Sequence, residues 1–275
     1  MASYRPATWR LLNTGWQDGP TNMAIDEALA EAVAAGESPP TLRFYGWDPA
    51  CLSLGYGQSW TVADWEECAG RGWDVVRRPT GGRAILHVDE LTYSVCAPES
   101  ERRVRGGVLE SYQRLSAALA HGLKLLGVEP ERAPRAGGPG GTKGPVCFDL
   151  PSSYEITVGG RKLVGSAQAR RKGVVLQHGT LPLYGDIGRI LHALCLEPPQ
   201  ERSHMVARLH QTATTLEASR GRRIEFDEAA AALRQGFSAA LALTFEEKPL
   251  TAGEKARAQE IRSEKFGDDA WTKRV

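Results

Sequence analysis

The chain has 275 residues, enough for one large domain or two small ones. Its 34 Lys and Arg residues balance 33 Asp and Glu residues, and the net charge of +1 argues against a general nucleic-acid or polyanion binder. Five scattered cysteines without a CxxC pair argue against a disulfide framework and a zinc site. Because no signal-peptide core and no apolar run of about eighteen residues occur, we expect a cytoplasmic protein with no membrane span.

The amino-terminal half alternates short apolar segments with helical patterns. Residues 8–15 predict a strand, and apolar residues at helical spacing then predict a helix that Pro20 opens and Gly36 ends. Asp26 and Glu27, placed near the start of that helix, fit the helix dipole and receive no catalytic role. Apolar, β-branched or alternating segments predict strands at 41–47, 50–57, 73–78, 84–87 and 90–97. Two further helices are predicted over 61–70 and 107–127.

The clearest local prediction is a hairpin over residues 153–170. Two alternating strands flank Gly159-Gly160, a favoured two-residue hairpin turn, and one more strand follows at 173–183. The preceding residues 134–146 break all periodicity and predict a surface loop. Within it GGPGGTKG is not a phosphate loop, because its lysine follows Thr142 and precedes a glycine.

The pattern becomes helical after Asp186. Helices are predicted near 186–195, 201–210, 227–242 and 251–265. We find no internal repeat. The prediction is an α+β fold, a mixed sheet flanked by helices over residues 1–245 with a small helical extension over 246–275.

Two side chains of the central region are candidates for acyl-transfer chemistry. Cys147 follows the glycine-rich loop, and a thiol that accepts and releases an acyl group needs access and a lowered pKa. Lys162 follows the hairpin turn on a strand of small and apolar residues, where its ammonium group could stabilise a thiolate or an oxyanion. The plainer alternatives are a buried structural cysteine and a solvated lysine. Alternation places Arg161 on the opposite strand face from Lys162.

The segment RRPTGGRAILH, residues 77–87, first suggests a phosphate cradle. A glycine pair lets backbone amides approach an anion, and arginines add fork-shaped charge. The histidines have no metal-ligand spacing, so no metal site is expected; His178 could be a core histidine, and His87 could orient the loop above it. The cysteines other than Cys147 are most simply packing residues: Cys51, Cys68, Cys96 and Cys195.

Four segments in order resemble one group of enzymes. They are RRPTGGRAILH, VCFDLPSSYE, GRKLVGSAQAR and GVVLQHGTLPL. Together with LRFYGWDPACLSLGYGQ at 42–58 they resemble the lipoate–protein ligase and octanoyltransferase superfamily, most closely the LipM-type octanoyltransferases, over about residues 8–245. The resemblance implies the biotin/lipoate protein ligase fold, which agrees with the α+β prediction.

The resemblance also implies a reaction in endogenous lipoate biosynthesis. An octanoyl group would pass from the phosphopantetheine arm of acyl carrier protein to a thioester on Cys147, with Lys162 lowering the thiol pKa and polarising the carbonyl. The final acceptor would be a lysine of an apo lipoyl-domain protein, either glycine cleavage H protein or 2-oxoacid dehydrogenase E2. The implied substrate-binding residues form two walls and a pocket: Arg77, Arg78, Thr80, Gly81, Gly82 and Arg83 on one wall, Gly165, Ser166 and Gln168 opposite, and His87, His178 and Gly179 in the pocket.

Neither ATP nor another cofactor is expected. ATP-dependent ligases of the superfamily typically carry a third glycine where this chain has Arg83, and His-Asp where it has His87-Val88. An ATP-dependent lipoate or octanoate ligase, a lipoyl-domain amidotransferase and a non-catalytic lipoyl-domain-binding protein remain as alternatives. The pattern demands no partner chain, so a monomer is expected. It leaves open the acyl chain length, the preferred acceptor and the base that deprotonates the acceptor lysine.

Overall fold

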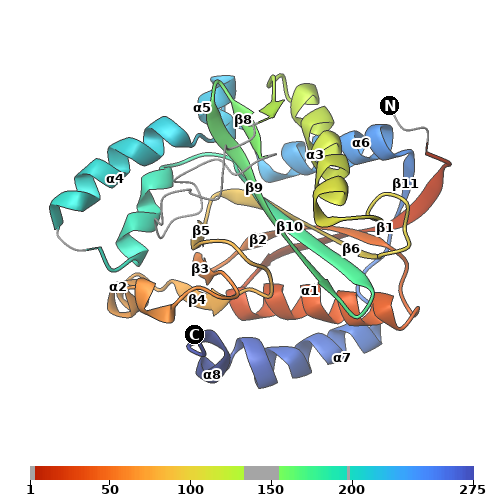
Figure 1. The fold of residues 1–275 in the computed structure, drawn as a ribbon, viewed down its shortest axis with the longest axis horizontal. Coiled ribbons are helices and arrows are strands. Elements are labelled where there is room, and N and C mark those ends of the chain that lie inside the picture. The colour runs from red at the N-terminus through yellow and green to blue at the C-terminus, as the bar shows by residue number, and fades with distance from the viewer. Residues whose placement is uncertain (1–3, 133–154, 197–198) are drawn as a thin grey trace.

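The computed structural model describes residues 4–132, 155–196 and 199–275. Its larger sheet has eight strands in the order β11-β1-β2-β6-β10-β9-β8-β7, and its smaller sheet has the order β4-β3-β5 (Figure 1). In the larger sheet β1 pairs in parallel with β2 and β11, whereas the other neighbours are antiparallel. The predicted mixed sheet flanked by helices is confirmed.

The strands have the following bounds: β1 (Ala7–Gln17), β2 (Thr41–Trp47), β3 (Cys51–Leu54), β4 (Asp74–Arg77), β5 (Ile85–His87), β6 (Glu90–Pro98), β7 (Glu131–Arg132), β8 (Ile156–Val158), β9 (Arg161–Arg171), β10 (Val174–Pro182) and β11 (Leu243–Glu247). The α-helices are α1 (Gly19–Ala34), α2 (Trp65–Gly70), α3 (Val108–Leu125), α4 (Pro199–Thr212), α5 (Leu216–Arg220), α6 (Phe226–Leu241), α7 (Ala252–Ile261) and α8 (Asp269–Thr272). Shorter helical turns cover Trp60–Val62, Ile187–Ala193 and Arg262–Phe266.

Helices cover both faces of the larger sheet. On one face α3 and α6 pack against each other and against a core that includes Tyr93 and Phe237 (Figure 1). On the other face α1 packs on the sheet through Met23 and Leu29, and α7 packs on α1. The smaller sheet, α2, α4 and the Ile187–Ala193 turn form a third apolar cluster. The larger sheet therefore separates the first two of these apolar cores.

Among the residues that the structure describes, no helix is long and apolar enough to cross a membrane.

Most predicted elements are present, and the differences have local causes. The helix predicted over 61–70 begins only at Trp65, because Asp64 caps it by accepting a hydrogen bond from the Glu67 amide at 3.0 Å. The segment 186–195 forms a 3₁₀ turn rather than an α-helix, and both α5 and β11 were not predicted. The predicted loop over 134–146 lies outside the described residues.

The carboxyl-terminal residues pack on the body of the protein. Glu254 of α7 accepts hydrogen bonds from Arg10 Nη1 at 2.9 Å and Arg10 Nη2 at 2.6 Å, and both side chains are buried. Burial alone would raise the pKa of Glu254, but the hydrogen bonds from Arg10 and Ser38 lower it to about 2. The division at residue 245 stays a prediction, although that position falls within β11.

Candidate functional site

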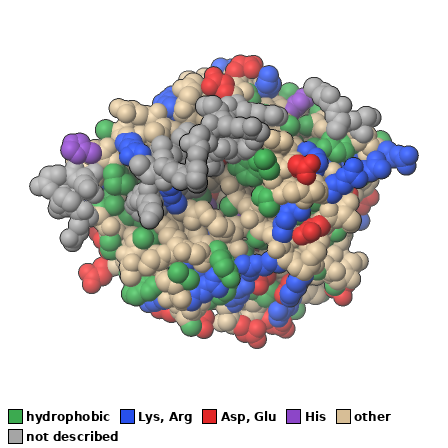
Figure 2. Space-filling view, in the orientation of Figure 1, with side chains coloured by type: hydrophobic (Ala, Val, Ile, Leu, Met, Phe, Trp, Pro, Cys, Tyr) green, Lys and Arg blue, Asp and Glu red, His purple; other side chains and the backbone are tan. Residues whose placement is uncertain are grey.

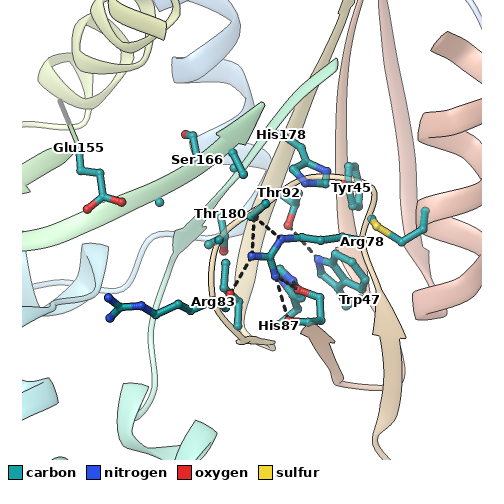
Figure 3. A pocket seen from close by; sticks show the side chains of 18 residues that line it. Tyr45, Trp47, Arg78, Arg83, His87, Thr92, Glu155, Ser166, His178 and Thr180 are labelled. Carbon is teal, nitrogen blue, oxygen red and sulfur yellow. Dashed lines mark hydrogen bonds between the residues drawn. The ribbon is translucent and has the colours of Figure 1, made fainter. Parts of the chain in front are cut away.

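A pocket of about 190 Å³ lies on the α1 side of the larger sheet, between β9, β10 and the loop after β4 (Figure 3). Tyr45 and Trp47 lie near one end of it, and Glu155 lies at the other (Figure 3). Nine predicted binding residues line it: Arg78, Gly81, Gly82, Arg83, His87, Gly165, Ser166, His178 and Gly179. The structure thus brings together segments that are up to about a hundred residues apart in the sequence.

Three of the predicted binding residues do not line this pocket. The Arg77 guanidinium is turned toward backbone carbonyls, donating to Gly55 at 2.7 Å and to Thr272 at 3.0 Å. Gln168 points to the α3 side of the sheet, where its amide donates to Ser111 Oγ at 3.0 Å. The prediction that the Arg77 and Gln168 side chains form part of the pocket walls is therefore wrong. Thr80 is also buried, and its hydroxyl contacts His178, which does line the pocket.

Arg78 shapes the loop that forms one wall. It is buried, and its guanidinium donates to the carbonyls of Ser53 at 2.9 Å, Gly81 at 2.9 Å and Arg83 at 2.7 Å. Gly82 has φ +98°, a conformation that favours glycine. The carbonyls of Gly81 and Arg83 therefore face the Arg78 guanidinium, which belongs to the same segment. The phosphate cradle suggested by the sequence is therefore not the role of Arg78.

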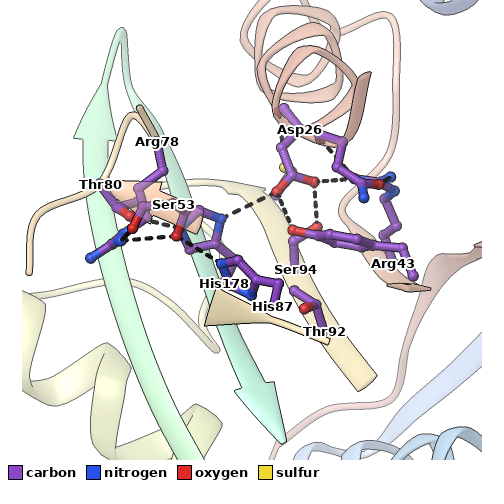
Figure 4. A network of polar contacts seen from close by, with 12 residues as sticks. Asp26, Arg43, Ser53, Arg78, Thr80, His87, Thr92, Ser94 and His178 are labelled. Carbon is purple, nitrogen blue, oxygen red and sulfur yellow. Dashed lines mark hydrogen bonds and ion pairs between the residues drawn. The ribbon is translucent and has the colours of Figure 1, made fainter. Parts of the chain in front are cut away.

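A buried chain of polar groups leads from α1 to this loop (Figure 4). Asp26 is fully buried and accepts from Arg43 Nη1 at 2.8 Å and Ser94 Oγ at 2.7 Å. His178 Nδ1 lies 3.3 Å from Asp26 Oδ2, and His178 Nε2 lies 2.6 Å from Thr80 Oγ1. Through this chain, the backbone position of Thr80 is tied to α1.

The charge states follow from the surroundings of these groups. Burial lowers the pKa of His178, so the ring is neutral at pH 7 despite its carboxylate neighbour. Burial would raise the pKa of Asp26, but the Arg43 charge and the bond to His178 outweigh it and lower the pKa. A neutral ring beside a carboxylate carries its proton on Nδ1, which leaves Nε2 to accept from Thr80.

Sequence reasoning missed Asp26. The helix begins at Gly19, so Asp26 lies well inside α1 rather than near its start, and the helix-dipole interpretation is wrong. The missed signal was its spacing: Asn22, Asp26, Leu29 and Val33 fall on one helical face, and all are buried. A carboxylate on an apolar stripe needs buried partners, which Arg43 supplies.

A second polar chain supports the other side of the pocket. His87 Nδ1 lies 2.8 Å from Glu90 Oε1, and His87 Nε2 lies 2.7 Å from Ser53 Oγ. Ser53 Oγ also accepts from Arg78 Nη1 at 3.0 Å. The Trp47 ring stacks on His87 with centroids 4.0 Å apart. His87 thus contacts Ser53, and Ser53 contacts Arg78 of the 77–83 loop. Through these bonds His87 can orient the loop, as the sequence analysis suggested.

Lys162 is fully buried, which rules out the solvated alternative. Its Nζ lies 2.5 Å from Glu155 Oε1, and the Glu155 side chain is 4% exposed. Glu155 lines the pocket, and sequence reasoning did not single it out. The ammonium group carries three N–H donors, and Glu155 accepts one of them. Cys147 lies outside the described residues, so its position relative to Lys162 is not part of this geometry.

The other cysteines have no place in the pocket. Cys51 and Cys96 are buried, and burial raises the pKa of both thiols far above 9; burial also raises that of Cys68 to about 11. Cys195 is exposed, so the packing interpretation is wrong for that residue. Among the described residues, no group of His, Cys, Asp and Glu side chains could hold a metal ion.

A basic surface adjoins the loop. The guanidinium carbons of Arg171 and Arg274 lie 4.6 and 3.9 Å from the centroid of the Tyr56 ring. Tyr56 in turn donates its amide to the Thr80 carbonyl at 2.9 Å. Figure 2 shows Lys and Arg side chains gathered across the lower centre and right of this face. The near-neutral chain therefore has a local cationic region beside the pocket loop.

The sequence is similar to known proteins over nearly its whole length. The sequence model of the lipoyl protein ligase A/B catalytic domain matches residues 18–238. Octanoyltransferase LipM of Symbiobacterium thermophilum is 44% identical over 272 residues, covering 97% of this chain and 98% of the relative. Octanoyltransferase LipM of Moorella thermoacetica is 46% identical over 269 residues, with coverage of 97% and 98%.

Solved structures show the same fold. A bi-partite lipoate protein ligase from Thermoplasma acidophilum superimposes with a TM-score of 0.82 at 23% identity, covering 98% of this chain and 97% of that one. A lipoate-protein ligase A bound with ATP gives a TM-score of 0.79 at 24% identity, with coverage of 97% and 99%. At these identities the likeness concerns the fold alone.

Proposed function

The chain belongs to the lipoyl protein ligase A/B catalytic-domain family, and within that family we propose that it is an octanoyltransferase of lipoate biosynthesis. Relatives of that activity align with nearly its whole length at 44% and 46% identity. The structural observation that carries the proposal is the buried Lys162–Glu155 pair at one end of a largely apolar pocket. An acyl group fits such a pocket, and a fixed cation beside it suits thioester chemistry.

The first half-reaction is acylation of Cys147. Its thiolate attacks the thioester carbonyl of octanoyl-acyl carrier protein, and the bond to the sulfur of the donor arm then breaks. Glu155 accepts one N–H of Lys162 and holds the ammonium group in place. The positive charge of the Lys162 ammonium group is suited to stabilising the Cys147 thiolate and the developing oxyanion.

The second half-reaction transfers the acyl group to an apo lipoyl-domain protein. A lysine amine of glycine cleavage H protein or of 2-oxoacid dehydrogenase E2 attacks the thioester, the Cys147 thiolate leaves, and the nitrogen loses one proton as the amide forms. No adenylate is needed because the donor is already a thioester, so the reaction proceeds without ATP. Arg171 and Arg274, beside the pocket loop, offer charge to the phosphate of the donor arm.

Mass spectrometry with octanoyl-acyl carrier protein and no ATP tests the proposal. The wild-type protein is expected to gain one octanoyl group on Cys147 and pass it to apo H protein, whereas Cys147→Ser should do neither. An activity that needs ATP and free octanoate, and survives Cys147→Ser, would instead identify a ligase. Octanoylated H protein as sole effective donor would identify an amidotransferase, and binding without turnover would identify a binding protein. The cytoplasmic location and the monomeric state remain predictions.

A further inference from the structure

A row of residues crosses the larger sheet along the pocket. Thr180 on β10 lies opposite Gly165 on β9 and opposite Thr92 on β6. Thr92 in turn lies opposite Tyr45 on β2. Paired residues of neighbouring strands project to the same side of a sheet, and all four of these residues line the pocket.

Glu155 extends this row at its other end. Because Ile156 at the start of β8 lies opposite Val164 on β9, the residue just before β8, Glu155, falls beside Gly165. Glu155 also lines the pocket and holds the Lys162 ammonium group. The row therefore runs from an ion pair, across the bare backbone of Gly165, to Thr180 and then to the aromatic end of the pocket.

The polar groups of this row differ in how they are satisfied. The Tyr45 hydroxyl donates to Asp26 Oδ2 at 3.1 Å, and the Thr92 hydroxyl donates to Glu90 Oε1 at 2.5 Å. The Thr180 side chain is also buried, and yet its hydroxyl has no hydrogen-bond partner among the described residues. Since a buried hydroxyl without a partner destabilises a protein, its presence in a pocket points to a partner supplied by the ligand.

We propose that the Thr180 hydroxyl donates a hydrogen bond to the carbonyl oxygen of the octanoyl thioester. The inference rests on the proposed function. The carbonyl oxygen is the one strong acceptor that an octanoyl group carries, so a donor inside the acyl pocket has no other atom to serve. Neighbouring strands lie about 4.8 Å apart, which puts Glu155 and Thr180 about 10 Å apart across Gly165. A carbonyl above Gly165 would lie between the Lys162 ammonium and the Thr180 hydroxyl.

This position also directs the acyl chain. With its carbonyl above Gly165, the hydrocarbon tail extends past Thr92 toward Tyr45 and Met23, which line the far end of the pocket. In the acylation step the Cys147 sulfur bonds to the carbonyl carbon, and the carbonyl π electrons move to the oxygen. Thr180 keeps its proton and donates it as a hydrogen bond. Collapse of the oxyanion expels the donor-arm thiolate, which takes up a proton from solvent.

Thr180→Val tests the proposal because it removes the hydroxyl and keeps the branched shape. We expect acylation of Cys147 at saturating octanoyl-acyl carrier protein to slow by about 100-fold, the effect of removing one oxyanion donor. Thr180→Ser keeps a hydroxyl and should retain most of the rate. The melting temperature of free Thr180→Val should rise by about 2–4 °C, since an unsatisfied buried group is removed.

Thr41→Val is the matched control. The Thr41 hydroxyl is buried outside the pocket, accepts from Arg10 Nε at 3.1 Å and donates to the Pro39 carbonyl at 2.9 Å. This variant should melt at a lower temperature with unchanged acylation. If Thr180→Val is acylated at the wild-type rate, or is slowed only in transfer to the acceptor lysine, the assignment is wrong while the octanoyltransferase stands. If wild type gains no octanoyl group, the proposed function itself fails.

Discussion

Asp26→Asn is the sharpest test of the buried polar chain. Arg43, Tyr45, Ser94 and His178 all place a donor group against the two Asp26 carboxylate oxygens. Asparagine keeps the shape but presents one oxygen and one NH₂ group, so two of these donors would face another donor. Arg43 would also lose its charged partner while both side chains are completely buried.

The expected cost follows from that burial. Removing one partner of a buried ion pair destabilises a protein by about 3–5 kcal/mol, against about 0–1 kcal/mol for an exposed pair. Asp269→Asn is the matched control, because the Asp269 carboxylate pairs with Lys273 Nζ at 2.6 Å but is 73% exposed. Urea unfolding of both variants measures the difference. Equal losses in the two would refute the structural role assigned to Asp26.

The same carboxylate carries a pH dependence with a definite sign. The folded-state pKa of Asp26 lies below its ordinary value of 3.8, so its stabilising contribution is present above that value. The contribution is lost as the pH falls through the lower, folded pKa. The unfolding free energy of wild type should therefore decline below about pH 4 more steeply than that of Asp26→Asn.

Three further variants test other parts of the site and its support. Glu155→Gln removes the carboxylate that pairs with the buried Lys162, so Cys147 acylation and stability should both fall, the latter by about 3 kcal/mol in urea unfolding. Gly179→Ala places a Cβ 2.4 Å from Ser166 Oγ and should cost about 1–3 kcal/mol, together with slower acyl transfer. Glu254 has a pKa of about 2 against an ordinary 4.5, so its contribution is full above pH 4.5 and is lost toward pH 2; Glu254→Gln should flatten that part of the stability curve.

Each of these expectations has an opposing result. Unchanged acylation in Glu155→Gln would mean that the ion pair is structural only. A fully stable and active Gly179→Ala would mean that β9 and β10 can move apart at little cost. If the stability of Glu254→Gln falls between pH 4.5 and pH 2 as steeply as that of wild type, other carboxylates cause the loss of stability in acid. Ser219→Ala, at a residue outside the pocket, serves as a common control for expression and handling.

The elements that the sequence predicted best are those whose pattern is local. The β8–β9 hairpin has a glycine-pair turn, and β10 is a short run of β-branched and apolar residues that follows it; both signals need no information from elsewhere in the chain. The charged strand β11 was missed, because LTFEE becomes a strand only by pairing with β1 at the edge of the sheet. Long-range pairing of this kind leaves no periodic signal in a five-residue segment.

The site was predicted by segment more accurately than by side chain. The resemblance named strands that line the pocket, but the Gln168 side chain lies on the α3 side of the sheet, where it bonds Ser111. The structural importance of Asp26 and Glu155 was not predicted, because it depends on what packs against them, Arg43 in one case and Lys162 in the other. A single charged residue in a helix or strand pattern carries no sequence signal that identifies its ion-pair partner.

The contacts of Arg77 have a practical consequence for handling the protein. Besides its bond to the Thr272 carbonyl, its own carbonyl accepts from Trp271 Nε1 at 2.9 Å, and the Val275 carbonyl accepts from the Trp60 amide. The last residues therefore fasten the strand from which the pocket loop departs. Removing residues 271–275 would break these contacts and loosen the pocket from behind, so these residues should be kept when the protein is prepared.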